Sequence, residues 1–296
     1  MEAGVEQADL MIAVTDSDEV NLLCCLIAKK RGDCKTIARV RNPVYNQEIS
    51  FLKEELGITM IINPEFTAAE EIARILSFPT AIEIDTFAKG KLELLKFKIP
   101  EDNLLDGHPI SDIMGHFKCN VLVCVVERGD EVIIPDGNFV LAEKDIISFV
   151  ADKRSAARFF KTIKIKINQV KDALIVGGGK TSYYLAKQLL SMGVRIKIIE
   201  MDKARCDQLN ELLPEALVIC GDGTDRELLI EEGLEYADSF VALTNMDEEN
   251  IMLSLFARNH SEAKLVTKIN KFDFGEVLSN LDLGSTISPK HLTARH

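Results

Sequence analysis

The stretch ALIVGGGKTSYYLAKQLL, residues 173–190, decides the fold of this chain. Its first four residues form a short apolar run of the kind that builds a buried parallel strand. Three consecutive glycines follow and allow the backbone to turn sharply, and a helix is predicted to begin near Thr181. A second apolar run then ends at Glu200. The pattern predicts the opening β-α-β unit of a doubly wound, Rossmann-like α/β sheet.

The same stretch indicates a nucleotide site. Glycines let the backbone approach a pyrophosphate closely, and the first N–H groups of the following helix attract the anion. An acid at Glu200 can accept hydrogen bonds from ribose hydroxyls, and its charge repels the extra phosphate of NADP. Ser182 stands where the third glycine of G-x-G-x-x-G is usual, so a tight strand–helix turn without a ligand stays open as an alternative. The predicted contacts here are Gly177, Gly178, Gly179, Lys180, Thr181, Ser182 and Glu200.

Two further strand ends carry polar residues that belong to the same predicted edge of the sheet. Asp222 and Gly223 follow the strand 216–220, and Thr244 and Asn245 follow an apolar strand that ends at residue 243. Ligands of open α/β sheets bind at the carboxyl ends of the strands. We therefore expect these four residues to line the nucleotide cleft. For Asp222, Thr244 and Asn245, ordinary capping of the strand ends is an open alternative.

Composition excludes several classes of protein. The 296 residues carry a formal net charge of −12, which argues against a nucleic-acid partner. No apolar run reaches the roughly 18 residues that a membrane span requires, and the N-terminus lacks a signal-peptide pattern, so a cytoplasmic protein is expected. The seven cysteines and five histidines show no metal-ligand spacing. We expect reduced cysteines and no metal.

The chain contains an internal repeat. Residues 4–21, GVEQADLMIAVTDSDEVN, align without a gap on residues 233–250, GLEYADSFVALTNMDEEN. The matched polar positions favour duplication over chance similarity of two Rossmann-like halves. Only the second copy is preceded by the glycine-rich half. The strand at residues 10–15 should be central in its sheet, so its unpaired apolar edge indicates either a fragment of a longer protein or cover by another chain.

A helix at residues 65–76 adds to the apolar surface of the first copy. Its apolar face is expected to remain available for a second chain, which predicts a homo-oligomer, either a dimer or a larger ring. The alternative is that the helix folds back on its own half-lobe and hides the strand edge. The residues of this face are Phe66, Ile72, Ile75 and Leu76.

The region between the two copies has a different character. Strands are predicted at residues 81–85, 92–98, 121–128, 131–134 and 145–150, with glycine and Asx turns between them and a closing helix at residues 153–162. The prediction is a small α+β domain at residues 81–166. It is flanked by half of a Rossmann-like lobe at residues 1–80 and by a nearly complete lobe at residues 167–296.

In these features the chain resembles TrkA-type potassium-uptake regulatory proteins, which are built from tandem RCK (KTN) domains. The resemblance covers essentially all residues, with the first nucleotide loop and the second C-lobe missing, as if truncated at both ends. It implies a cytoplasmic regulatory subunit, peripheral to the inner face of the membrane, that forms a ring under a potassium-translocating subunit of Trk or Ktr type. It also implies NAD(H), or ATP and ADP, as the bound nucleotide. The motifs that carry it are IVGGGKTSYYLAKQL, CGDGTD, AVTDSDEVN, ALTNMDEEN and VIIPDGNFVLAEKDIISFVAD.

The alternative function is an NAD-dependent oxidoreductase of Rossmann type. Tyr183 and Lys187 have the Tyr-x-x-x-Lys spacing of short-chain dehydrogenases. In that family the pair belongs on a later helix, whereas here it lies on the first helix after the glycine loop. The sequence offers no other acid–base or nucleophile arrangement by spacing. The prediction is therefore a regulator that is not an enzyme.

Overall fold

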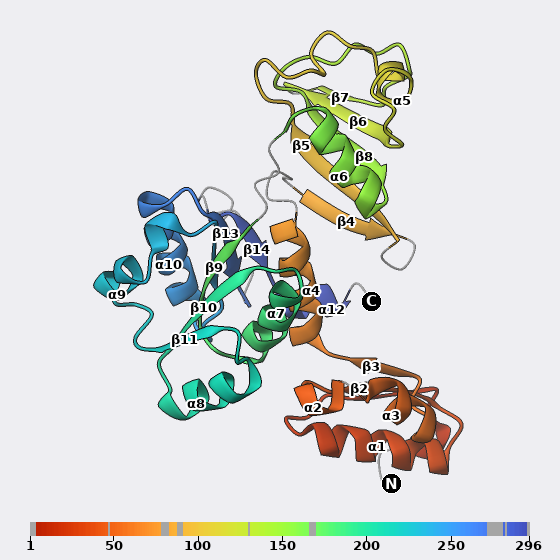
Figure 1. Ribbon diagram of the computed structural model, residues 1–296. Coiled ribbons are helices and arrows are strands. Elements are labelled where there is room, and N and C mark those ends of the chain that lie inside the picture. Colours follow the sequence, from red (N-terminus) through yellow and green to blue (C-terminus); the bar gives the residue numbers. More distant parts are fainter. Residues whose placement is uncertain are drawn as a thin grey trace. The chain divides into compact units, whose positions relative to one another are not determined.

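The structure of the chain is a computed structural model, which describes residues 4–46, 48–77, 83–87, 91–129, 131–165, 170–270, 281 and 283–294 (Figure 1). Its contacts divide the chain into two compact units. One unit combines Met1–Ala73 with Lys171–His296, and the other, here called the middle unit, is Arg74–Val170. Among the residues that can be described, no helix is both long and apolar enough to cross a membrane.

The second lobe, residues 171–294, is built on a six-stranded parallel sheet in the order β11-β10-β9-β12-β13-β14. The strand order reverses between β9 and β12, as in a doubly wound fold. The Rossmann-like prediction is confirmed. The strands are β9 Asp172–Val176, β10 Arg195–Glu200, β11 Leu217–Cys220, β12 Ser239–Ala242, β13 Lys264–Lys268 and β14 Ser285–Ile287. The helices are α7 Lys180–Ser191, α8 Lys203–Leu212, α9 Arg226–Glu231, α10 Asp247–His260 and α12 Pro289–Ala294, with the 3-10 turn η2 Leu234–Tyr236.

Burial on both faces explains why the central strands read as continuous apolar runs. All four residues of β12 are buried, and so are Ala173 to Val176 of β9. Phe240, Leu174 and Leu253 belong to one apolar cluster that joins the sheet to α10. Two covered faces require apolar side chains at successive positions, not only at alternate ones.

The first lobe, residues 4–62, repeats the carboxyl-terminal half of the second lobe. Its three parallel strands have the order β1-β2-β3 and correspond to β12, β13 and β14. Gly4 and Gly233 both adopt a left-handed conformation, with φ of 71° and 89°, and each begins a 3-10 turn. The elements are η1 Val5–Gln7, β1 Leu10–Ala13, α1 Asp18–Arg31, β2 Lys35–Arg39, α2 Pro43–Asn46, α3 Ile49–Glu55 and β3 Met60–Ile62.

Strand β1 lies at the edge of the described first-lobe sheet, whereas its counterpart β12 is central. Leu10 is 48% exposed and Ile12 is 54% exposed, while β12 is fully buried. The apolar edge predicted from the repeat is therefore present in the structure.

Helix α4, Pro64–Ser77, corrects one expectation. Ile72, Ile75 and Leu76 are buried within the chain, with exposed fractions of 0%, 9% and 2%. The prediction that this apolar face stays free for a second chain is wrong. Phe66, at the start of α4, packs edge-to-face on Tyr184 of α7, with ring centroids 5.4 Å apart. The start of α4 therefore contacts the second lobe, and the edge of β1 stays exposed.

Tyr184 links the first lobe to α7 through its hydroxyl group. The hydroxyl donates to the carbonyl oxygen of Arg41 at 3.1 Å and accepts from the side-chain amide of Asn63 at 3.0 Å. Burial is the main cause that raises the pKa of Tyr184 to about 12, so the hydroxyl remains a neutral donor and acceptor.

We expect Tyr184→Phe to lower the free energy of unfolding by about 1–2 kcal/mol, because it removes two hydrogen bonds in a buried place and keeps the ring. Urea denaturation followed by circular dichroism measures this loss. Tyr183→Phe is the matched control, since Tyr183 is equally buried on α7 and its hydroxyl makes neither contact. Equal stability of the two variants would contradict the role given to the Tyr184 hydroxyl.

The middle unit is an α+β domain, as predicted, with an antiparallel ladder in the order β4-β5-β8-β6-β7. Phe97, Phe149, Phe159 and Phe160 form its aromatic core. The strand predicted from residue 81 is described from Glu83 on, and the turn predicted at residues 88–90 lies outside the described residues. The elements are β4 Glu83–Phe87, β5 Leu92–Lys98, α5 Ser111–Gly115, β6 Leu122–Arg128, β7 Glu131–Ile133, β8 Ile146–Ala151 and α6 Lys153–Thr162.

The sequence predicts Asp145 as the first residue of a strand, but in the structure the strand begins one residue later. Asp145 is 1% exposed and lies just before β8, where its carboxylate accepts from Nε and a terminal nitrogen of Arg128, both at 2.7 Å. The backbone amide of Ala142 donates to the same carboxylate at 2.9 Å. These three donors compensate the burial of the charge and explain why an acid stands at the start of an apolar strand.

Candidate functional site

A cleft of about 480 Å³ opens at the carboxyl ends of β9, β10 and β12 in the second lobe. This is the edge where the strand order reverses and where ligands of doubly wound sheets bind. The cleft is lined by Val176, Gly177, Gly178, Gly179, Ile199, Glu200, Met201, Asp202, Arg205, Asp222, Gly223, Thr224, Leu243, Thr244, Asn245, Met246 and Glu249.

The glycine loop forms one wall of the cleft. The three glycines differ in what a side chain at each position would meet. Gly177 has φ of 98°, and a β-carbon there would lie 2.8 Å from the backbone of Leu243. A β-carbon on Gly178 would lie 2.8 Å from the Glu200 carboxylate. Gly179 has φ of −66°, and its β-carbon would meet nothing within 4 Å. The fold requires glycine at position 177, whereas a side chain at position 178 would displace the side chains of Leu209 and Glu200, and position 179 opens space beside the cleft.

The loop leads into the N-terminus of α7. Gly179 is the N-cap residue, and no side chain of the described residues caps the helix there. The first amide groups of α7 are thus positioned for an anion. Lys180 is exposed at this end, while Thr181 and Ser182 are buried. These three predicted residues do not belong to the cleft lining.

Ser182, which replaces the third glycine of the motif, fits into the contact between helix and strand. Its side chain is completely buried, and its hydroxyl donates to the carbonyl oxygen of Gly177. The serine therefore fastens the start of α7 to the glycine loop, while its small size preserves close contact between helix and strand.

Glu200 connects the two sides of the cleft. One carboxylate oxygen accepts from the backbone amide of Gly178 at 2.6 Å, and the other accepts from the amide of Asp202 at 2.8 Å. The carboxylate is thereby held beside the glycine loop, where it lines the cleft. That Glu200 contacts a ribose stays a prediction.

Arg205 is a cleft residue that the sequence analysis did not identify. Its Nε donates to the carbonyl oxygen of Gly178 at 2.7 Å, from the first turn of α8. A cation in the first turn opposes the helix dipole, so an arginine at this position needs a local partner. That mismatch, three residues after the N-cap Asp202, is the signal that could have revealed it.

Asp222 and Gly223 form the next part of the lining. The Asp222 carboxylate accepts from the backbone amide of Thr224 at 2.8 Å and from its hydroxyl at 2.7 Å. The amide first and the hydroxyl second lower the pKa of Asp222, so it is ionised at neutral pH. A β-carbon on Gly223 would overlap the side chain of Val176. Asp222 therefore stabilises the turn through its bonds to Thr224 and also lines the cleft.

Thr244 and Asn245 complete the far side. The Thr244 amide donates to the side-chain oxygen of Asn250 at 2.8 Å, and the Asn250 amide group donates to the carbonyl oxygens of Thr244 and Lys268. Asn250 is fully buried on α10 and joins the ends of β12 and β13. The position of Thr244 therefore depends on a side chain that lies outside the cleft.

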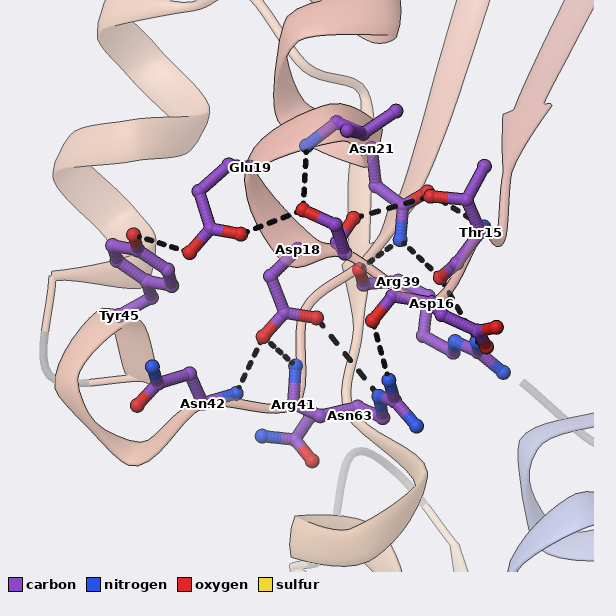
Figure 2. Close-up of polar contacts among 12 residues, drawn as sticks. Thr15, Asp16, Asp18, Glu19, Asn21, Arg39, Arg41, Asn42, Tyr45 and Asn63 are labelled. Atoms are coloured by element: carbon purple, nitrogen blue, oxygen red, sulfur yellow. Dashed lines mark hydrogen bonds and ion pairs between the residues drawn. The ribbon is translucent and has the colours of Figure 1, made fainter.

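The first lobe carries the same bonding pattern, shown in Figure 2. Asn21 accepts from the Thr15 amide at 2.7 Å and donates to the carbonyl oxygens of Thr15 and Arg39. Asp18 accepts from the amides of Arg41 and Asn42, and its counterpart Asp247 accepts from the amide of Asn270. Both copies of the repeat therefore build their strand ends in the same way.

Tyr183 and Lys187, the pair that suggested a dehydrogenase, lie elsewhere on α7. The Tyr183 ring is 5% exposed, and the Lys187 ammonium lies 5.6 Å from its centroid. Neither residue lines the cleft. The tyrosine packs inside the lobe, where it has no access to a carbonyl substrate in this cleft.

Comparison with known families matches most of the chain. The TrkA-N domain model matches residues 1–64 and 173–289, and the TrkA-C domain model matches residues 94–164. The Trk system potassium uptake protein trkA homolog 1 of Methanosarcina mazei is 35% identical over 297 residues, which cover 98% of this chain and 73% of that protein. The homolog of Archaeoglobus fulgidus is 34% identical, with 99% and 66% covered.

The Haemophilus influenzae protein of the same name, Trk system potassium uptake protein TrkA, is 31% identical, with 99% of this chain and 64% of that protein covered. The chain thus spans about two thirds of the length of most of these relatives. The crystal structure of the GsuK RCK domain is similar at a TM-score of 0.68 and 20% identity, covering 98% of this chain and 61% of that one. The GsuK channel bound to NAD has a TM-score of 0.67 at 19% identity, with 99% and 51% covered. These two likenesses concern the fold.

Proposed function

Because the chain belongs to the TrkA family, we propose that it is a nucleotide-binding, non-catalytic regulatory part of a potassium-uptake system. One observation carries the proposal. At the point where the strand order reverses, the carboxylate of Glu200 is bonded to Gly178, beside a helix N-terminus that no described side chain caps. This combination of an acid, a glycine loop and available amides fits a nucleotide with a pyrophosphate and a ribose.

The residues present fit NAD(H) or ADP and ATP. The pyrophosphate would lie against Gly177 to Gly179 and the first amides of α7, and Glu200 would accept from the ribose hydroxyls. Arg205 would stand beside the adenosine half, and Asp222, Thr244 and Asn245 would border the remainder of the cleft. Solved structures of similar fold include the GsuK channel bound to NAD and GsuK bound to ADP, which supports both choices.

The proposal extends to organisation and partners. Residues 1–80 form half of a first RCK N-lobe, residues 81–166 form the RCK C-lobe, and residues 167–296 form the second N-lobe with the nucleotide site. The protein would act at the cytoplasmic face of the membrane, as a dimer or ring, on a membrane potassium-translocating subunit of Trk or Ktr type. The names of the relatives support this reading.

The experiment is a calorimetric titration of the purified chain with NADH, NAD, ATP and ADP. We expect binding of at least one of them, and Glu200→Ala should weaken it by about 1–3 kcal/mol, because the ribose hydroxyls lose their acceptor. Glu211→Ala is the matched control, since it removes an exposed carboxylate of α8 that does not line the cleft. Unchanged NADH affinity in Glu200→Ala would defeat the assigned ribose contact, and absence of all binding would defeat the proposed function.

A further inference from the structure

Two cysteines meet behind the cleft at the Glu200 carbonyl group. Cys206 lies on α8 and is 3% exposed, and its thiol donates to the carbonyl oxygen of Glu200 at 3.2 Å. Cys220 is the last residue of β11 and is paired in register with Glu200 of β10. The amide of the next residue, Gly221, donates to the same Glu200 oxygen at 2.9 Å.

This convergence places the two thiols together. The Cys206 sulfur and the peptide that follows Cys220 share one acceptor, and Cys220 is near enough to Cys206 to raise the pKa of its thiol. Figure 1 shows α8 beside β11, which is the edge strand of the second-lobe sheet. The two residues differ in access, since Cys220 is exposed and Cys206 is buried.

We propose that Cys206 and Cys220 form a redox-modification site, in which a hydroperoxide oxidises the two thiols to a disulfide. In the first step the Cys220 sulfur attacks the O–O bond and becomes a sulfenic acid, and the hydroperoxide leaves as an alcohol or as water. In the second step the Cys206 sulfur displaces the hydroxyl group from Cys220, forms the S–S bond and releases water. In total the two thiols lose two protons and two electrons, which reduce one O–O bond.

The environment sets the order of the steps. Burial first, and the neighbouring Cys220 second, raise the pKa of Cys206 to about 11, so Cys206 is a protonated thiol at neutral pH and a poor first nucleophile. Cys220 faces solvent and is the thiol that an oxidant reaches. Cys206, at the carbonyl group of the strand residue paired with Cys220, is then the resolving thiol that redox-sensing pairs require.

The site lies next to groups that shape the cleft, and this part of the inference rests on the proposed function. Arg205, which precedes Cys206, holds the carbonyl oxygen of Gly178. A disulfide would remove the Cys206 bond to Glu200 and tie α8 to the end of β11, immediately before the Asp222 turn. We expect the oxidised chain to bind NADH about tenfold more weakly, a loss the size of one ordinary hydrogen bond.

The test treats the full chain with hydrogen peroxide, blocks free thiols, and maps linked peptides by mass spectrometry without reduction. We expect a Cys206–Cys220 peptide and a fall in titratable thiols from seven to about five, reversed by dithiothreitol. Cys124→Ser, in the middle unit, should behave as the parent, whereas Cys206→Ser and Cys220→Ser should each abolish the linked peptide. Seven remaining thiols, or a sulfinic acid on Cys220 with Cys206 free, would overturn the proposal.

The affinity measurement separates the two inferences. Calorimetry with NADH is run on the reduced chain, on the oxidised chain and on peroxide-treated Cys220→Ser. A linked peptide with unchanged NADH affinity would overturn the coupling to the cleft while the thiol site stands. If the reduced chain binds none of the four nucleotides, the proposed function fails, and the peptide map still decides the thiol site.

Discussion

Replacing Gly177 with alanine is expected to lower the free energy of unfolding of the second lobe by about 2–4 kcal/mol. Two effects contribute, since alanine is strained at a φ of 98° and its β-carbon would lie 2.8 Å from the backbone of Leu243. The atoms in the way belong to the backbone of Leu243 at the end of a central strand, and unlike a side chain they cannot rotate away from the new β-carbon. Urea denaturation followed by far-ultraviolet circular dichroism measures the loss, because the chain has no tryptophan.

Gly179→Ala is the matched control, two residues further along the same loop. Gly179 has an ordinary φ of −66°, and its β-carbon would meet nothing within 4 Å, so stability should change by less than about 1 kcal/mol. The new methyl group would nevertheless occupy the side on which a pyrophosphate approaches α7. We expect about tenfold or greater loss of NADH affinity in a folded protein. Equal destabilisation by both variants would show that the steric distinction within the loop is wrong.

The sequence was informative wherever local chemistry determines structure. The glycine loop, the strand before it and Glu200 all lie where the β-α-β pattern predicts them. Each of these features depends on backbone conformation and on the burial of a short segment, which neighbouring residues in the sequence report directly. The antiparallel strands of the middle unit follow from turn residues in the same way.

Features that depend on distant contacts could not be predicted. The sequence of α4 shows an apolar face, but not that this face would be buried within the chain, with Phe66 on Tyr184. The bonds of Arg205 to Gly178 and of Ser182 to Gly177 go to backbone carbonyl groups, which every residue carries and no pattern distinguishes. The pairing of Cys206 with Cys220 likewise depends on the packing of α8 beside the edge strand.

The repeat is the exception, because it compares the chain with itself. The aligned asparagines, Asn21 and Asn250, make the same three hydrogen bonds to the same strand ends. Their surroundings differ. Thr15 is exposed, whereas Thr244 is half-buried, and the bond from Asn250 to Lys268 is fully buried while the bond from Asn21 to Arg39 is only partly so.

Asn250→Ala is therefore expected to cost about 2–4 kcal/mol of unfolding free energy, because the Thr244 amide and two carbonyl groups lose their partner where water has little access. Asn21→Ala removes the same bonds from a side chain that is also fully buried, but its partner Thr15 is exposed, so the loss should be only about 1 kcal/mol. Hydrogen exchange assigns each loss to its lobe, since the amides of β12 should lose protection in one variant and those of β1 in the other. Equal losses would mean that burial does not set the cost. Because Thr244 borders the cleft, Asn250→Ala should also weaken NADH binding, whereas Asn21→Ala should leave it unchanged.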